Sequence, residues 1–460
     1  MKSPAVRRRE APILGRLRAR RIVDLYSMRV APALAAALIG LGHLPDAEVA
    51  AALGLLALGA NVALSRARFP FGLMPVARFA ASVAAPVIAA AIVVPIAAYG
   101  GHQVTPAELA PSIVAATLTT GLGAWLKARF DASAELRVAV VGASADADVV
   151  AREIRSAGVS GYRVAGAIVP RGVASVDAAG VLGALVDLRS IVSRESLDLL
   201  VNASGERGEV FERASRDCLG QPVRILELSQ FCEDVLGHVP AGSIDSGWFR
   251  YLMHPRFRGD AAPGKRLFDL AVGTGIALVV APAVLALALA IRLADGGPAI
   301  YRQRRVGAGG REFTIVKLRT MTVGAQRVTS LGRFLRATHF DELPQLWNVL
   351  RGEMTLVGPR PERPGRVAEL ERRFRHYERR HLVKPGITGW AQVQCGYAGS
   401  ETGTAWKLSH DLYYLKHRSL LADALLLVET VRAVGDGARR RAEQVERPFA
   451  LGGASAGRIA

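Results

Sequence analysis

The chain has 460 residues, half of them hydrophobic, and its three cysteines form no CxxC pair, so neither a disulfide framework nor a zinc finger is indicated. This length accommodates about two to four domains, and the hydrophobic share exceeds what one soluble core usually needs, which predicts a membrane-embedded part. The net charge of +19 indicates an anionic partner, and a phosphate-bearing substrate, acidic lipid headgroups and nucleic acid all fit it.

Four apolar segments, each near the ~20 residues that a helix needs to cross a bilayer, lie in the N-terminal part, residues 1–130. They are residues 28–45, 48–65, 79–99 and 109–126. The loops after the first and third segments contain no Lys or Arg, whereas the N-terminal tail, the second loop and the exit from the fourth segment are basic. This alternation predicts a four-helix transmembrane bundle with both ends cytoplasmic. A soluble, alanine-rich bundle is the alternative.

The middle part, residues 131–245, changes to short β-like runs that alternate with helical patterns, which predicts a small parallel, Rossmann-like α/β domain. The turn after its first run, GASADA, has only Gly142 of the three glycines in a dinucleotide fingerprint. We therefore expect no cofactor here and a regulatory or assembly role, with nucleotide sensing as the alternative. Residues 246–263, with several Gly and Pro, are interpreted as a linker.

The last domain, residues 264–435, begins with an apolar stretch of about 22 residues that would extend ~33 Å as a straight helix. Pro282 lies at its centre, where it removes a backbone hydrogen bond. Both flanks are basic, so the charge pattern favours neither direction of crossing. These facts predict a re-entrant membrane helix, broken at Pro282, that returns to the same face; a fifth crossing is the alternative. Residues 436–460 are predicted to be a basic, flexible tail.

Two adjacent acids, Asp341 and Glu342, precede a short predicted helix that ends at Gly352. Asp341 is a natural N-cap, and capping alone is the structural alternative. Two neighbouring carboxylates exceed what capping needs, however, and with Arg336 nearby they suit a divalent ion and a phosphate.

Two further motifs follow the acids. In Pro359-Arg360-Pro361 the prolines restrict the backbone on both sides of the arginine, which favours a fixed guanidinium for bidentate phosphate recognition. In the loop 384–397, Gly386 and Gly389 would let a ligand approach the backbone, and Trp390 is either a core residue or a stacking surface.

Seven sequence motifs follow one another in the last domain. They are KRLFD (265–269), Pro282, KLRTM (317–321), DELPQLWNVLRGEM (341–354), VGPRPE (357–362), KPGITGWAQV (384–393) and DLYYL (411–415). In this combination the chain resembles the bacterial polyprenyl-phosphate hexose-1-phosphate transferases, the monotopic phosphoglycosyl transferases. The four apolar segments and the α/β domain resemble, by layout, their long members that initiate exopolysaccharide or O-antigen synthesis.

The resemblance implies transfer of a sugar 1-phosphate from a nucleotide diphosphate sugar, with UDP-hexose expected, to undecaprenyl phosphate, with release of UMP. Asp341 would be the nucleophile that forms a covalent phosphosugar intermediate, and Asp341 and Glu342 would ligate Mg²⁺, with Mn²⁺ as an alternative ion. The residues implied in phosphate binding are Arg336, Arg360, Lys384, Lys317 and Arg319. Some members of the family have arginine at the position of Lys384. A lysine offers a point charge in place of a planar fork, so it does not make the two-armed phosphate contact of an arginine.

The resemblance also implies a location and partners. The protein would be a multi-pass protein of the bacterial inner membrane, with its catalytic domain at the cytoplasmic face and in contact with membrane lipid. The middle domain offers a surface for a homodimer. Two alternatives belong to other classes: a catalytically inactive, membrane-anchored sensor or scaffold, and a nucleic-acid binder. The latter rests on charge alone and lacks an aromatic and basic motif, so no nucleic-acid partner is expected.

Overall fold

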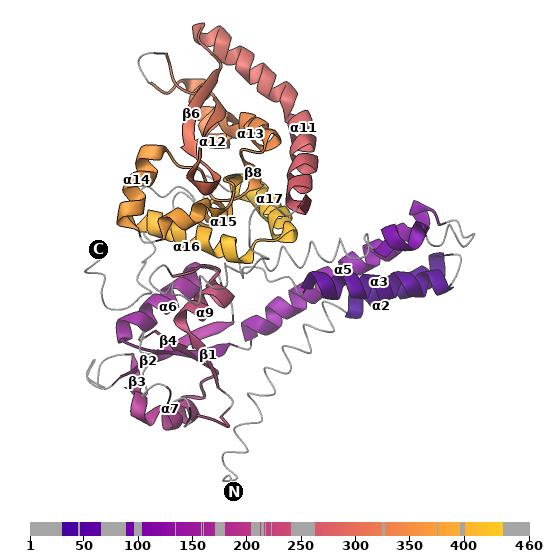
Figure 1. Cartoon of the computed structure of the whole chain (residues 1–460). Coiled ribbons are helices and arrows are strands. Elements are labelled where there is room, and N and C mark those ends of the chain that lie inside the picture. The colour runs from indigo at the N-terminus through magenta and orange to yellow at the C-terminus, as the bar shows by residue number, and fades with distance from the viewer. Residues whose placement is uncertain are drawn as a thin grey trace. The chain divides into compact units, whose positions relative to one another are not determined.

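The computed structural model describes residues 30–44, 47–65, 89–95, 104–133, 135–157, 159, 161–170, 180–203, 212, 216, 218–221, 223–240, 263–323, 327–374, 376–395 and 401–435. The chain divides into two compact units, Met1–Leu236 and Gly237–Ala460. Figure 1 shows the elements of both.

Helices cover the described parts of all four predicted apolar segments. They are α2 (Ala31–His43), α3 (Ala47–Ser65), the helical residues 89–95 and α5 (Pro106–Ser133). Small residues fill the space between them: a Cβ on Gly54 would lie 2.6 Å from the Cβ of Ala37, and Ala50, Ala57 and Ala89 are buried in their common core. Large side chains point outward instead, among them Leu34, Leu38, Leu55 and Leu118. Leu44, Leu53 and Leu109 are buried in the same core, so the packed faces of these helices combine small and large apolar side chains.

The parallel α/β domain predicted in the middle of the chain is confirmed. Its five strands are β1 (Leu136–Val141), β2 (Tyr162–Val169), β3 (Val181–Ala184), β4 (Leu199–Asn202) and β5 (Arg224–Glu227). They form one parallel sheet in the order β3-β2-β1-β4-β5. The helices α6 (Ser144–Ser156) and α7 (Leu188–Glu195) connect strands of this sheet, because parallel neighbours need crossover connections.

The second unit contains two small sheets surrounded by helices. Its elements are α11 (Pro263–Asp295), β6 (Ile300–Val306), β7 (Glu312–Leu318), α12 (Ser330–Thr338), the 3₁₀-helix η8 (Phe340–Gln345), α13 (Leu346–Arg351), β8 (Thr355–Val357), α14 (Pro364–Arg373), the 3₁₀-helix η9 (Tyr377–Leu382), β9 (Gly386–Thr388), α15 (Trp390–Cys395), α16 (Glu401–His417) and α17 (Leu420–Gly435). Strands β6 and β7 form an antiparallel hairpin, and β8 pairs with β9 in parallel.

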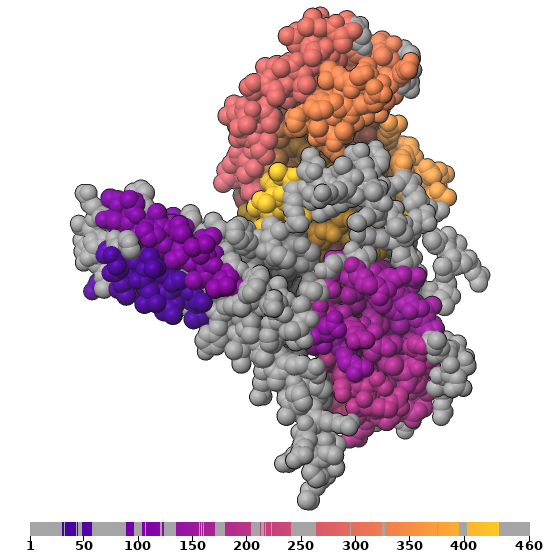
Figure 2. Space-filling view, turned by 180° about the vertical axis from the view of Figure 1, so that it is seen from behind, coloured from indigo at the N-terminus to yellow at the C-terminus, as the bar shows by residue number. Residues whose placement is uncertain are grey.

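Helix α11 is the only described helix that is long and apolar enough to cross a membrane. Only 6% of its most apolar stretch is buried, and Leu278 and Val279 are 71% and 80% exposed. A core helix of a soluble protein would have these residues covered. Figure 2 shows α11 lying along the surface of the second unit.

The expected break at Pro282 is not an interruption of the helix. Helix α11 continues from Pro263 to Asp295 with Pro282 inside it, and Figure 1 shows the helix bent along its length. A proline removes one backbone hydrogen bond and pushes away the carbonyl four residues earlier, while the bonds on either side persist. The helix therefore accommodates Pro282 without leaving the helical conformation.

The second unit includes a short piece that the sequence assigned to the α/β domain. Residues 237–240 precede the predicted linker, yet the indole nitrogen of Trp390 donates to the carbonyl of Gly237 at 2.7 Å. The amide of Val239 donates to the carbonyl of Ser409 at 3.2 Å. These contacts attach the segment to α15 and α16 of the second unit.

Candidate active site

Glu342 is a buried acid at the centre of an ion cluster in the second unit. Its Oε1 accepts hydrogen bonds from Lys317 Nζ at 2.7 Å and from Arg360 Nη2 at 2.5 Å, and its Oε2 accepts from Arg360 Nη1 at 3.1 Å. Lys317 comes from strand β7, Glu342 from η8, and Arg360 from the loop after β8. Three predicted site residues, distant in the sequence, therefore meet in the structure.

The two cations decide the ionisation of Glu342. Burial raises its pKa, but the charges of Arg360 and Lys317, together with their hydrogen bonds, lower the pKa to about 2. Burial also lowers the pKa of Lys317, against the opposing effect of Glu342. Glu342 is therefore a carboxylate at neutral pH, held in one orientation.

Asp341, beside it, is in a different state. Its side chain is half-buried, and among the described residues its carboxylate makes no hydrogen bond or ion pair. Burial and the charge of Glu342 raise its pKa, whereas Lys317, His339 and Arg360 lower it. Of the two acids, Asp341 is the one with its oxygens open to a ligand.

The helix that carries the acids differs in its start from the prediction. Asp341 is not its N-cap; this position belongs to His339, in the left-handed conformation with φ 60°. The first turn is of the 3₁₀ type and continues into α13, which ends, as predicted, at Gly352 with φ 83°. The left-handed turn at His339 separates α12 from η8, so the carboxylates lie within the first turn and are not used for capping.

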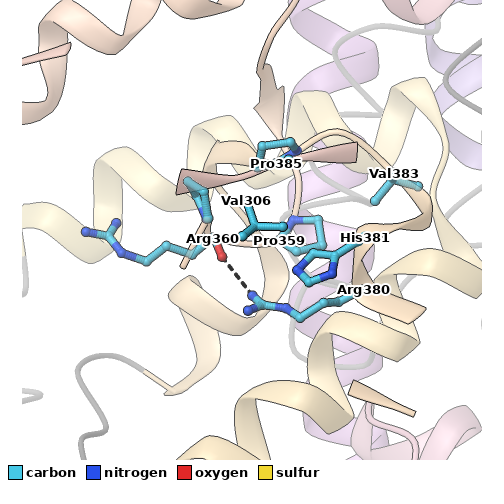
Figure 3. Close-up of a pocket in the computed structure, with 9 residues that line it drawn as sticks. Val306, Pro359, Arg360, Arg380, His381, Val383 and Pro385 are labelled. Atoms are coloured by element: carbon cyan, nitrogen blue, oxygen red, sulfur yellow. Dashed lines mark hydrogen bonds between the residues drawn. The ribbon is translucent and has the colours of Figure 1, made fainter. Parts of the chain in front are cut away.

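The carbonyls of the Pro-Arg-Pro segment are all anchored. The carbonyl of Pro359 accepts from the Gly386 amide at 3.0 Å, that of Arg360 from Arg380 at 2.8 Å, and that of Pro361 from Arg305 at 3.1 Å. Figure 3 shows the small hollow that the Pro-Arg-Pro segment and Arg380 help to line, with Arg380 pointing to the Arg360 carbonyl while the Arg360 side chain extends away. The backbone is thus fixed, as the prolines predicted, and the guanidinium is directed to Glu342.

Three other predicted phosphate-binding residues lie outside this ion cluster. Arg336 is exposed, and its Nε donates to Thr320 Oγ1 at 2.9 Å. Arg319 is buried and donates to the carbonyls of Pro298 and Met321. Such contacts to backbone carbonyls hold the chain after β7 in place. The backbone of Lys384 lies directly against Gly358, since a Cβ there would lie 2.5 Å from the Lys384 carbonyl oxygen.

The glycines of the loop at 384–397 pack against protein backbone. A Cβ on Gly386 would lie 2.1 Å from the amide nitrogen of Gly358, and one on Gly389 would lie 2.2 Å from its carbonyl oxygen. The backbone of Gly358 therefore fills the space that the glycines predicted for a ligand. Trp390 is buried, with its indole donating to the Gly237 carbonyl, so it is a core residue and not a stacking surface.

A second buried ion cluster, which sequence reasoning missed, joins the start of α11 to the rest of the unit. Lys265 contacts Asp423 at 2.7 Å and Asp269 at 3.3 Å. Asp269 also accepts from Thr355 Oγ1 at 2.7 Å, and Tyr414 donates to Asp423 at 2.9 Å. The spacing of Lys265 and Asp269 on one helix face was the available signal.

The comparisons with known proteins agree with these motifs. Residues 261–437 match the family described as bacterial sugar transferase. The chain is 37% identical, over 50% of its length, to the UDP-N-acetylgalactosamine-undecaprenyl-phosphate N-acetylgalactosaminephosphotransferase of Aeromonas hydrophila, of which it covers 57%. It is 38% identical, over 47% of its length, to the UDP-glucose:undecaprenyl-phosphate glucose-1-phosphate transferase of Caulobacter vibrioides, of which it covers 88%.

A third relative is the UDP-glucose:undecaprenyl-phosphate glucose-1-phosphate transferase of Escherichia coli. The chain is 39% identical to it over 36% of its own length and covers 39% of that protein. The match thus spans less than two thirds of the Aeromonas and Escherichia proteins but nearly all of the Caulobacter protein.

Proposed function

The chain belongs to the bacterial sugar transferase family of polyprenyl-phosphate sugar-phosphate transferases, and from this premise we propose that it transfers a sugar 1-phosphate from a UDP-sugar to undecaprenyl phosphate. UMP is the second product, and the reaction is the first membrane step of exopolysaccharide or O-antigen synthesis. The observation that carries the proposal is the open carboxylate of Asp341 beside the Glu342, Lys317 and Arg360 cluster.

The relatives share the nucleotide and the lipid acceptor but differ in the sugar. Their printed names differ in the sugar, N-acetylgalactosamine in one and glucose in two, but all include UDP and undecaprenyl phosphate. A site that binds phosphate and lipid suits these shared parts. We therefore propose UDP as the nucleotide and undecaprenyl phosphate as the acceptor, and the sugar is to be identified by experiment.

Asp341 is proposed as the nucleophile. Its carboxylate oxygen attacks the phosphorus that bears the sugar, the bond from that phosphorus to the bridging oxygen breaks, and UMP departs. An oxygen of the lipid phosphate then attacks the same phosphorus, and the Asp341 carboxylate leaves unchanged. One difficult displacement is thus divided into two. Glu342 holds Lys317 and Arg360 beside the reacting phosphate, where their positive charge stabilises the anion that develops.

Mg²⁺ is the proposed cofactor, with Mn²⁺ as an alternative, and the donor set fits such an ion. Carboxylate oxygens are the ligands that Mg²⁺ prefers, and Asp341 has both oxygens open. The Glu342 carboxylate accepts three hydrogen bonds, which leaves about one of its four lone-pair positions. Asp341 would therefore be the main ligand, with at most one oxygen from Glu342. When bound, the ion would neutralise charge on the pyrophosphate.

The exposed apolar surface of α11 supports a location at the membrane. The ion pairs of Lys265 with Asp423 and Asp269 join the start of this helix to the rest of the second unit. Arg266 donates to the carbonyls of Val349 and Leu350 in α13, the helix that follows the two acids. We place α11 as a re-entrant helix in the bacterial inner membrane, with four crossings before it and the active site on the cytoplasmic face. A soluble nucleotide sugar and a lipid phosphate can meet there.

The experiment that tests this function is a panel of UDP-sugars incubated with undecaprenyl phosphate, Mg²⁺ and the purified chain in nanodiscs. We expect UMP release and a lipid-linked sugar diphosphate with at least one UDP-sugar. Absence of both products across a panel that includes UDP-glucose and UDP-N-acetylgalactosamine, with folded protein, would favour the inactive scaffold.

A further inference from the structure

A buried arginine behind the Pro-Arg-Pro segment connects it to two other elements of the unit. Arg380, on η9, is only 6% exposed, and its Nη2 contacts both the Arg360 carbonyl and Asp411 Oδ2 on α16 at 2.8 Å. Its Nη1 donates to the hydroxyl of Tyr377 at 2.6 Å. Tyr377 and Asp411 are buried as well.

The contacts of Arg380 fix its guanidinium and direct it to the backbone of Arg360. A guanidinium paired with a buried carboxylate is fixed in position, because the charge cannot be solvated elsewhere. This fixed donor binds the carbonyl of Arg360, while the side chain of the same residue contacts both carboxylate oxygens of Glu342. The Arg360 carbonyl is therefore held by Arg380, as Figure 3 shows, while the Arg360 side chain contacts Glu342.

The neighbouring anchors do not replace this contact. The Pro359 and Pro361 carbonyls are held by Gly386 and Arg305, but Arg360 lies between them and its carbonyl orientation sets the peptide plane from which its side chain projects. Losing the donor would also remove a hydrogen bond from this carbonyl and the ion pair between Arg380 and Asp411.

We propose that Arg380, held by Asp411 and Tyr377, is a positioning residue that acts through the Arg360 backbone to orient the Arg360 guanidinium at Glu342. The inference rests on the proposed transferase function, because its readout is UMP formation. The polar contacts of Arg380 go to the Arg360 carbonyl, Tyr377 and Asp411, so its effect on Glu342 passes through Arg360.

The test is a double-mutant cycle in the full-length chain, measured by single-turnover UMP formation. Arg380→Lys keeps the charge but loses the two-armed contact, and we expect the rate to fall about 10- to 100-fold, as small misplacements of catalytic groups do. In an Arg360→Lys background, where there is no guanidinium to orient, the same change should cost less than about threefold. Tyr377→Phe removes only one hydrogen bond and should show the same pattern with a smaller loss.

Arg266→Lys is the matched control. Arg266 also donates to two carbonyls of this unit, Val349 and Leu350, but none in the Pro-Arg-Pro segment, so any loss should be equal in both backgrounds. If Arg380→Lys folds poorly, the Tyr377→Phe cycle decides by itself. Equal losses from the Arg380 and Tyr377 changes in both backgrounds, or no loss in either, would overturn the inference. Lack of UMP formation by the unchanged chain would count against the transferase function itself.

Discussion

Arg360 contacts Glu342 through both arms of its guanidinium, with Nη1 3.1 Å from Oε2 and Nη2 2.5 Å from Oε1. This bidentate pair gives a fixed geometry, and with Lys317 it satisfies most of the hydrogen-bonding capacity of Glu342. Asp341, its neighbour in sequence, has no comparable contact among the described residues. The two adjacent acids therefore differ in their surroundings: Glu342 is bound at both oxygens, whereas Asp341 has its oxygens open.

The first prediction concerns the covalent intermediate. After the chain is mixed with an accepted UDP-sugar and Mg²⁺ but no lipid, peptide mass spectrometry should show a sugar-phosphate adduct on the peptide that contains Asp341. The adduct should disappear when undecaprenyl phosphate is added. Asp341→Asn should abolish both adduct and UMP release, whereas Glu342→Gln should slow adduct formation without moving it to another peptide. A rapid reaction without any adduct would indicate direct displacement.

The second prediction is a pair of opposite pH shifts. The proposed nucleophile, Asp341, must be ionised to attack, so kcat/KM should fall as the pH drops through its pKa, which burial and Glu342 raise and Lys317 lowers. Lys317→Gln removes a cation and should move this acid limb to higher pH. Glu342→Gln removes an anion and should move it to lower pH. Parallel shifts in the two variants would show that another group controls the acid limb.

A third prediction tests the backbone packing at Gly389. Gly389→Ala places a Cβ 2.2 Å from the Gly358 carbonyl oxygen, so the backbone must move, and we expect a loss of stability above about 2 kcal/mol. The control is Gly365→Ala in α14, where an added Cβ meets nothing within 4 Å. That change should be neutral or stabilise by up to about 1 kcal/mol. Thermal unfolding in detergent measures both, and equal melting temperatures for both variants would contradict the packing argument.

The fourth prediction uses fragments to test the supporting role that we expect for the α/β domain. A fragment that begins at Gly237 should keep transferase activity in nanodiscs, because residues 237–240 supply the carbonyl that Trp390 binds and the backbone that pairs with Ser409. A fragment that begins at Asp260 lacks these contacts and should be active but unfold at lower temperature. Complete inactivity of a folded, membrane-inserted Gly237 fragment would mean that the α/β domain takes part in the reaction.

The fifth prediction is topological. If α11 enters and leaves by the cytoplasmic face, Tyr301→Cys, in a chain without its own cysteines, should resist labelling by an impermeant maleimide from the periplasmic side of intact cells. Adding Pro282→Leu restores the missing backbone hydrogen bond and straightens the helix. This change should make a fraction of the molecules accessible. Full labelling of Tyr301→Cys with Pro282 intact would instead support a fifth crossing.

The amino-acid sequence by itself determined the features that depend on neighbouring residues. The apolar length of α11, four of the five β-runs of the parallel sheet and the short helix that ends at Gly352 follow from composition and spacing over a few turns. Strand β3 and the start of the helix at Phe340 were not predicted. The prolines beside Arg360 likewise indicated a rigid segment, because a proline restricts its own residue and the one before it.

Only the tertiary structure decided which groups meet. Lys317 and Arg360 are 25 and 18 residues from Glu342 in the sequence. No local sequence pattern shows that both side chains bind Glu342 and that neither binds Asp341. The glycines at 386 and 389 show the same limit, since a missing Cβ suits a ligand or a neighbouring backbone equally well until the fold places Gly358 against them. Ion pairs and close backbone contacts depend on distances between elements, and packing of the whole unit sets those distances.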